Sequence, residues 1–280
     1  MKKITRRSFL AAAGLTAAAL ALTACGGSSS STASSVASSA AASSEAASSS
    51  AAAAELTTVE AGKLTMATNA AFPPYEMTTD AGDFEGIDIE TAQAIADKLG
   101  LELQIDDMDF DAALLSVQQG KADIVMAGVT VTDERKAVMD FSDSYATGIQ
   151  SIIVPEGSDI ASPDDLAGKK IGTQRGTTGY IYCSDDFGDD NVVAYDDGLT
   201  AVQALNNGQV DAVVIDNAPA QEFIAANPGL KILDTSYAEE DYAIGVAKGS
   251  SLKDAVNAAL EELKADGTLQ SIVDKYITAE

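Results

Sequence analysis

Two stretches of this chain, residues 115–125 and 203–213, follow one pattern. In each, a helical stripe ends at a glycine, and three positions later an aspartate opens a short apolar run of the kind that buried parallel strands show. Helix-glycine-strand is a common unit, so a single copy would say little. Two copies favour two lobes of similar build. Because ligands of such sheets bind beyond the carboxyl ends of the strands, two facing lobes would share one cleft.

Helix and strand patterns alternate from residue 56 to the end of the chain. Residues 87–99 carry apolar side chains at helical spacing and are followed by Gly100, which predicts one helix and its end. Further helices are predicted near 110–117, 252–263 and 269–277, and strands at 63–69, 101–105, 123–126, 170–172, 191–193 and 211–215. Alternating β and α units predict an α/β fold in which each lobe is a mainly parallel sheet flanked by helices. We assign lobe 1 to residues 56–147 and 244–280, and lobe 2 to residues 148–243.

The first 24 residues predict a signal peptide. A start with four basic side chains is followed by an apolar run that is somewhat short for a membrane-spanning helix. The run ends in Leu-Thr-Ala before Cys25, which resembles a bacterial lipobox, where the cysteine is lipidated and becomes the mature N-terminus. An ordinary signal peptide with an incidental cysteine is the alternative. The pair Arg6-Arg7 fits a twin-arginine export signal and plain n-region charge equally well.

Residues 25–55 are almost wholly serine and alanine. They offer no apolar stripe to bury, and interleaved serine competes for the backbone, which predicts a flexible, disordered tether. Past this tether no apolar run is long enough to span a bilayer. We therefore expect an extracytoplasmic domain that a lipid alone holds at the cell membrane.

Composition excludes several classes of function. The net charge of -26 repels the phosphates of nucleic acids and anionic membrane surfaces. The chain has no histidine, which removes the Ser-His-Asp and Cys-His catalytic arrangements and the commonest zinc ligand. Two cysteines are too few for a disulfide framework, and we expect Cys183 to be an unpaired thiol in a helix. We expect no metal, no cofactor and no nucleic-acid partner.

Several motifs of the predicted folded part occur in the order that one known family shows. They are FPPYE at 72–76, GIDIE at 86–90, GVTVTDER at 128–135 with DFS at 140–142, GTQRGTT at 172–178 and VVID at 213–216. With them, the chain from residue 56 onward resembles the polar amino-acid family, family 3, of bacterial solute-binding proteins, the bilobed receptors of ABC importers. The resemblance implies a periplasmic-binding-protein-like fold of type II and an amino acid as the ligand. It also implies a permease and its ATPase as partners, and a monomer that is not an enzyme.

The resemblance further implies how the head of an amino acid would be held. Arg135 matches the family's carboxylate clamp, because a guanidinium offers two parallel donors to one carboxylate. A solvated surface arginine is the alternative. Thr130, the backbone near Gly128, and Thr178 match further partners of the head group. Asp216 matches the partner of the ligand's ammonium, with a purely structural aspartate as the alternative.

The resemblance assigns the ligand's side chain to a second set of residues. Phe72 and Phe110 match the aromatic pair that sandwiches the ligand, although Phe110 also fits core packing on a helical stripe. Relatives that select basic ligands carry an aspartate at position 69, and the amide of Asn69 cannot neutralise a buried cation. We therefore expect a polar, uncharged L-amino acid. Gln174 and Arg175 flank the same cleft, and Arg175 leaves an acidic ligand open.

Two other functions remain open from the sequence. A few dehydratases of prephenate-like acids use the same fold, but their ligands lack an ammonium group where Asp216 would meet it. A sensory lipoprotein that passes its ligand to no transporter would carry the same motifs.

Overall fold

The computed structural model describes residues 56–277. The predicted signal peptide, the predicted lipidation at Cys25 and the predicted tether lie outside these residues, so all three stay predictions. Within the described part, no helix is long and apolar enough to cross a lipid bilayer.

A mixed sheet of nine strands forms the centre of the described part. Its order is β5-β1-β6-β12-β7-β10-β8-β9, and β11 pairs with β7. The strands are β1 (Lys63–Thr68), β5 (Glu102–Asp107), β6 (Ile124–Val125), β7 (Met139–Pro155), β8 (Ile171–Gln174), β9 (Val192–Tyr195), β10 (Ala212–Asp216), β11 (Leu230–Ile232) and β12 (Ala238–Ala247). A smaller sheet holds β2 (Ala71–Phe72), β3 (Glu76–Thr78) and β4 (Phe84–Glu85).

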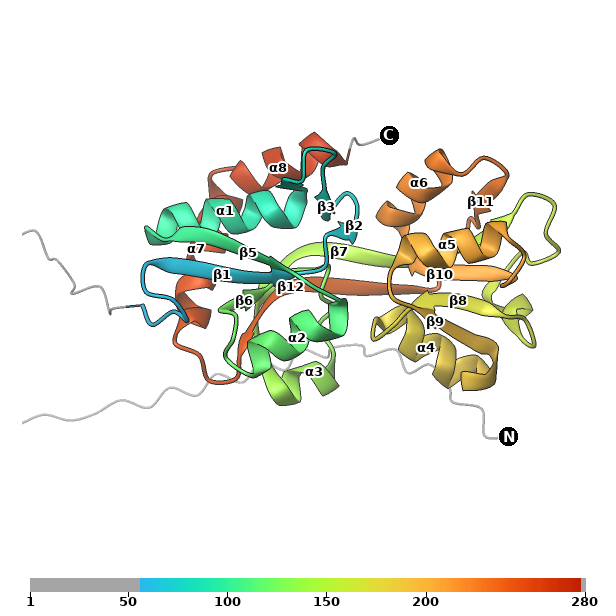
Figure 1. The fold of residues 1–280 in the computed structure, drawn as a ribbon, viewed down its shortest axis with the longest axis horizontal. Helices are drawn as coiled ribbons and strands as arrows, with labels where there is room; N and C mark the ends of the chain where they lie inside the picture. The colour runs from blue at the N-terminus through green and yellow to red at the C-terminus, as the bar shows by residue number, and fades with distance from the viewer. Residues whose placement is uncertain (1–55, 278–280) are drawn as a thin grey trace, which may run out of the picture. The chain divides into compact units, whose positions relative to one another are not determined.

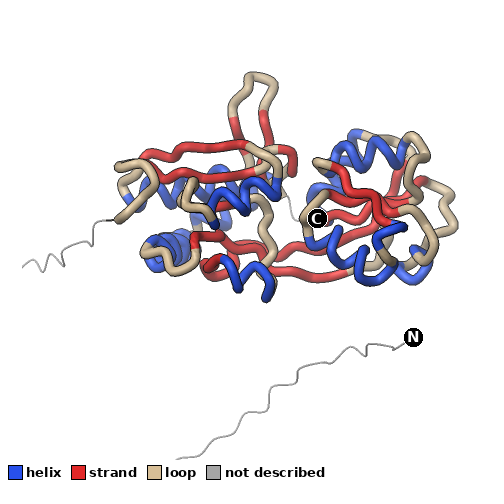
Figure 2. Tube along the Cα trace, turned by 60° about the horizontal axis from the view of Figure 1, so that its bottom comes forward, coloured by secondary structure: helices blue, strands red, loops and turns tan. Residues whose placement is uncertain are grey.

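Two long antiparallel strands, β7 and β12, connect the two lobes (Figure 1). On the side of lobe 1, β5, β1 and β6 pair in parallel, and on the side of lobe 2, β10, β8 and β9 do the same. Figure 2 shows strands continuing from one helix-covered end to the other. The structure therefore has the predicted two-lobed α/β architecture, with its two parallel parts joined into one sheet by shared strands. The predicted lobe boundaries, at 147/148 and 243/244, fall inside β7 and β12 and stay a prediction.

Helices cover both faces of the sheet in each lobe, as the alternating pattern predicts. They are α1 (Ile87–Leu99), α2 (Phe110–Gln118), α3 (Asp133–Val138), α4 (Thr178–Phe187), α5 (Gly198–Asn206), α6 (Asn217–Ala226), α7 (Leu252–Ala265) and α8 (Thr268–Tyr276). In Figure 1, α1 and α8 lie above the sheet of lobe 1 and α2 and α3 below it, while α5 and α6 lie above the sheet of lobe 2 and α4 below it.

Local signals account for the ends of α1. Gly100 closes the helix in the left-handed conformation, with φ at 70°, and its N–H reaches the last helical carbonyls. The apolar face of α1 packs toward strand side chains such as Leu64 and Ile124, which are fully buried. Burying a side chain of this size contributes about 1.5–3 kcal/mol. Both the extent and the buried face of this helix match the prediction.

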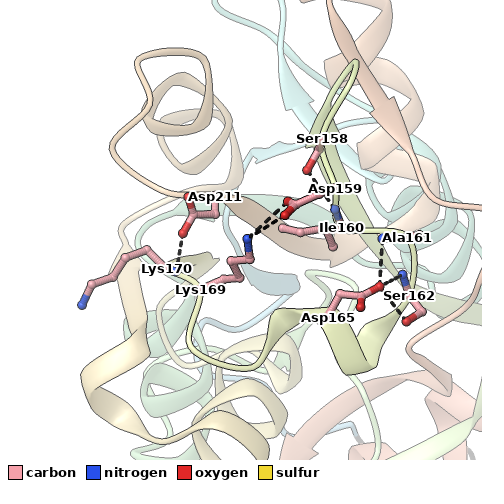
Figure 3. Close-up of polar contacts among 9 residues, drawn as sticks. All are labelled: Ser158, Asp159, Ile160, Ala161, Ser162, Asp165, Lys169, Lys170 and Asp211. Carbon is pink, nitrogen blue, oxygen red and sulfur yellow. Dashed lines mark hydrogen bonds and ion pairs between the residues drawn. The ribbon is translucent and has the colours of Figure 1, made fainter.

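The repeated sequence pattern corresponds to a repeated local structure. The glycine that follows α2 and the glycine that follows α5 both have φ at 66°, a conformation that glycine adopts without strain. Asp123 Oδ2 then accepts the backbone N–H of Thr65 at 2.8 Å, and Asp211 Oδ2 accepts that of Lys170 at 2.8 Å (Figure 3). These contacts bring β6 beside β1 and β10 beside β8, both in parallel. The same unit is thus built once in each lobe.

Candidate ligand-binding cleft

The nine residues predicted to bind the ligand all line one cavity. Lobe 1 supplies Asn69, Phe72, Phe110, Gly128, Thr130 and Arg135, and lobe 2 supplies Gln174, Thr178 and Asp216. The cavity measures about 30 Å³. The fold brings the nine residues together, and their role in binding remains a proposal.

Side-chain hydrogen bonds cross the cavity from one lobe to the other. Gln174 Nε2 donates to Asn69 Oδ1 at 2.8 Å, and the hydroxyls of Thr130 and Thr178 lie 3.3 Å apart. Asn69 also donates through Nδ2 to the Met108 carbonyl at 3.0 Å, so its amide oxygen is the atom that faces lobe 2. These contacts join four of the predicted ligand-binding side chains in pairs.

Arg135 places a guanidinium in the cleft. The residue lies in the first turn of α3, where Thr132 caps the helix by accepting the Arg135 N–H at 3.2 Å. Nη1 donates to the Thr130 carbonyl at 2.8 Å, and Nη2 donates across the cleft to the Gly176 carbonyl at 3.2 Å. The Phe110 ring centre lies 5.3 Å from the guanidinium carbon. Both lobes and an aromatic face therefore hold this side chain in place.

The charge of Arg135 is buried without an ion-pair partner among the described residues. Only 8% of the residue is exposed. Burial lowers the pKa of its guanidinium, and the nearby carboxylate of Glu240 opposes that effect. Arginine keeps its proton in proteins, so the cation remains. An unpaired buried charge costs several kcal/mol and favours an anion that enters the cleft. This burial does not fit the alternative of a solvated surface arginine.

Asp216 supplies a buried carboxyl from the side of lobe 2. It ends β10 and caps α6, with Oδ1 accepting the Ala218 N–H at 3.0 Å and Oδ2 accepting the Ile149 N–H at 2.7 Å. Burial raises the pKa of Asp216 from 3.8 to about 6, against the effect of those two N–H groups. Asp216 therefore caps a helix, which is the structural role that the sequence left open as an alternative. Its carboxyl also lines the cavity, where a cation would offset the cost of its burial.

The two predicted aromatic residues form walls of the cavity and are buried. Phe72 stacks on Tyr75 with 5.8 Å between ring centres, and Tyr75 meets Tyr242 edge to face at 5.4 Å. Phe110 begins α2 and also belongs to a core cluster that includes Val117. Core packing and cleft wall, which the sequence left as alternatives for Phe110, are thus combined in one ring.

Polar residues that the sequence analysis missed complete the cleft. Glu76, Gln150 and Tyr242 line the cavity. Glu240 lies beside it, where Oε2 accepts from Thr130 Oγ1 and from Gln150 Nε2, both at 3.0 Å. Gln150 and Glu240 lie on β7 and β12, whose mixed polar and apolar sequences predict neither strand clearly. Strand pairing alone brings these two side chains together.

Arg175 does not join the residues that line this cavity. Its side chain is 56% exposed and lies 3.6 Å from Asp196. With Asp109 and Asp111 it lines a neighbouring pocket of about 300 Å³. Arg175 is therefore not placed to hold an acidic ligand in this cavity, as that alternative requires.

Comparisons with known proteins agree with this geometry. The L-cystine-binding protein TcyJ of Escherichia coli K12 is 33% identical over 226 residues, which cover 79% of this chain and 85% of that protein. The arginine-, lysine-, histidine-binding protein ArtJ of Geobacillus stearothermophilus has a similar crystal structure, with a TM-score of 0.75, 34% identity, and coverage of 78% of this chain and 96% of that one. An ancestral arginine-binding protein bound to glutamine also has a TM-score of 0.75, with 42% identity and coverage of 79% and 100%.

The match to a family extends over both lobes. Residues 64–279 fit the sequence pattern of the bacterial extracellular solute-binding proteins, family 3. Both the type II bilobed fold and the prediction of a binding protein instead of an enzyme are confirmed, so the dehydratase alternative is wrong. The two lobes, the polar cleft and the extent of this match together place the chain in family 3 of the bacterial extracellular solute-binding proteins.

Proposed function

We propose that this protein captures a free L-amino acid in the cleft and delivers it to the permease and ATPase of an ABC importer. The observation that carries the proposal is the buried Arg135, unpaired among the described residues, in the same cavity as the buried Asp216. An amino acid brings a carboxylate for the cation and an ammonium for the carboxylate. One ligand thereby relieves two buried charges. A ligand with only one of these groups would leave a charge unpaired.

The named ligands of the relatives support an amino-acid head site. TcyJ is named for L-cystine, ArtJ for arginine, lysine and histidine, and the ancestral protein was bound to glutamine. These ligands share the α-amino-acid head and differ in their side chains. The head site and the side-chain site therefore have to be argued separately for this chain.

Our first candidate for the ligand is a polar, uncharged amino acid. Asn69 and Gln174 meet across the cavity through a hydrogen bond of 2.8 Å. An amide or hydroxyl of the ligand can replace that bond on both sides, because each amide offers a donor and an acceptor. No charge has to be buried in this exchange.

A cationic amino acid is the second candidate, and the excess of acid favours it. Glu76 and Asp216 line the cavity and Glu240 lies beside it, whereas Arg135 is the one basic residue among the described residues that line it. A neutral ligand leaves this excess of acids over cations unchanged. A second positive charge on the ligand would balance it.

The test of the head site compares two arginines of the same cleft region. We expect Arg135→Ala to weaken binding of amino acids by about 2–5 kcal/mol, because the ligand carboxylate would be buried unpaired. Arg175→Ala is the matched control, since its side chain is exposed and lines the neighbouring pocket. Calorimetry measures both. Binding of the Arg135→Ala protein within twofold of the unmodified protein would refute the head site.

The side-chain class is decided by a panel of amino acids. Thermal unfolding is measured with glutamine, cystine, arginine, lysine, histidine and glutamate, since a ligand at a hundred times its Kd adds about 2.7 kcal/mol of stability. Tightest binding of glutamine supports the first candidate, and tightest binding of arginine or lysine supports the second. Asn69→Asp should shift preference toward the basic amino acids if position 69 controls selectivity.

We also propose that the domain acts outside the cytoplasm as a monomer, anchored through lipid on Cys25. The lipobox-like sequence and the extracellular family support this arrangement. Uptake of the labelled ligand by cells, measured with and without this protein, separates transport from the sensory alternative. Unchanged uptake in cells that lack the protein would favour sensing.

A further inference from the structure

Two fully buried carboxyls, Glu76 and Asp88, lie together beneath the candidate cleft. Glu76 begins β3 and lines the cavity, and Asp88 lies in the first turn of α1. Both residues are 0% exposed, and the Asp88 N–H donates to the carbonyl of Tyr75, the residue before Glu76, at 2.8 Å. Neither one forms an ion pair with a described residue. Two adjacent buried carboxylates without a cation would be costly, which raises the question of what makes the pair tolerable.

The hydrogen bonds around the pair indicate one missing proton. Asp88 Oδ2 accepts from the Gly128 N–H at 3.0 Å and from the Tyr145 hydroxyl at 2.8 Å. Asp88 Oδ1 and both oxygens of Glu76 have no donor among the described residues. A proton on Glu76 would let one of its oxygens donate to Asp88 Oδ1. That single proton satisfies two of the three unpartnered atoms and leaves one acceptor of Glu76.

Apart from burial, the described groups that act most strongly on the pKa of Glu76 are the acids Asp88 and Asp107. Arg135 lines the same cavity but forms no ion pair with Glu76. Asp107 adds a further negative charge nearby, and its Oδ1 accepts the Ala70 N–H at 2.8 Å. Tyr145 donates to Asp88, as described, and Tyr75 is the second phenol close to the pair. Burial, with Asp88 and Asp107 as neighbouring charges, raises the pKa of Glu76 well above its ordinary value. Burial also raises the pKa of Asp88 to about 6, with the two donors opposing.

We propose that Glu76 carries a proton at neutral pH, donates it to Asp88, and presents an uncharged carboxyl to the ligand. Glu76 is then a positioning residue: it holds Asp88, and Asp88 holds the N–H of Gly128. Gly128 has φ at 53°, and a side chain there would lie 2.8 Å from the Phe72 ring. The pair thereby fixes a backbone turn of the cleft without adding a negative charge to it. This inference goes beyond the proposed function and does not depend on which amino acid binds.

Glu76→Gln provides the test, because glutamine imitates a protonated glutamate. Its amide can donate to Asp88 Oδ1 and keep an acceptor, with no proton to lose. Glu85→Gln is the matched control, since Glu85 lies in the same small sheet and is exposed. Unfolding by denaturant from acidic to alkaline pH compares both variants with the unmodified protein. The unmodified protein should lose stability as pH rises through the pKa of Glu76, and Glu76→Gln should not.

Infrared spectroscopy of protein with carbon-13-labelled glutamate gives a readout that does not depend on binding. We expect the band of a protonated glutamate carboxyl at about pH 7 in the unmodified protein and in Glu85→Gln, and its loss in Glu76→Gln. Labelled glutamate that shows only carboxylate bands in the unmodified protein would overturn the proposal, even if the variant did not fold.

Discussion

Replacing Asp216 with asparagine should stabilise the free protein at neutral pH and weaken its binding of amino acids. In the unmodified protein, ionised Asp216 is buried, and its pKa is raised from 3.8 to about 6. A carboxyl with a raised pKa stabilises the fold fully below about pH 4, and this contribution is lost as pH rises through about 6. Asparagine has no charge to bury, so the variant lacks that loss.

The size of the effect follows from the same pKa. A change from 3.8 to about 6 means that folding disfavours the ionised form by about 3 kcal/mol at pH 7 and above. Asparagine has one acceptor for the N–H groups of Ala218 and Ile149, so one hydrogen bond of about 1 kcal/mol is lost. We expect the variant to be about 2 kcal/mol more stable at pH 8, or about 5 °C higher in Tm. Below pH 4 it should be about 1 kcal/mol less stable.

Unfolding by denaturant at acidic, intermediate and alkaline pH measures this difference, with Asp185→Asn as the control on the exposed face of α4. Calorimetry with L-glutamine and L-arginine measures binding, which should weaken at least tenfold because the ligand's ammonium loses its partner. A stability difference that does not change with pH would refute the buried charge. Unchanged affinity would refute the ammonium site. The two parts of the prediction can therefore fail separately.

Three further predictions concern other parts of the chain. Gly176→Ala should weaken binding roughly tenfold in calorimetry, because φ is 73° and the new methyl would lie 1.7 Å from Asp111 Oδ1 across the cleft; unchanged affinity would contradict this. Cys183 is buried in α4, and burial raises the pKa of its thiol to about 12, so a thiol reagent should label it only in the unfolded protein. Cys25→Ser should release the protein from membranes or block its processing, and mass spectrometry of an unlipidated Cys25 in the unmodified protein would rule out the anchor.

Local sequence predicted much of the fold correctly because the relevant signals lie within a few residues. The extent of α1 follows from an apolar stripe and from Gly100 in the left-handed conformation. The repeated helix-glycine-aspartate-strand pattern predicted a unit that each lobe contains. Asp123 accepts a backbone N–H of β1, and Asp211 accepts the backbone N–H of the residue just before β8. The family resemblance implied nine ligand-binding residues, and the fold brings all nine to one cavity.

Only the tertiary structure placed Glu76 and Glu240 beside Asp216 at the cleft. Glu76, Asp216 and Glu240 come from three strands far apart in sequence, and no local spacing predicts that their carboxyls share one region. Because these acids outnumber the cation Arg135, a cationic ligand becomes a second candidate beside the uncharged one that Asn69 predicts. Position 69 alone could not show this, because charge balance depends on everything that surrounds a cavity.

The sequence by itself predicted many of the elements and the repeated unit, because both depend on short-range periodicity. Contiguous motifs carried the resemblance that indicated the family and implied the residues of the head site. Strand pairing decided the rest. Along β7 and β12 a mixture of polar and apolar residues gives way to a run of buried residues, so their 17 and 10 residues show no single period. Gln174 ends β8 and lines the cleft cavity, whereas the next residue, Arg175, lies in the following turn and is exposed. Such directions depend on contacts between distant segments, which form only when the chain folds.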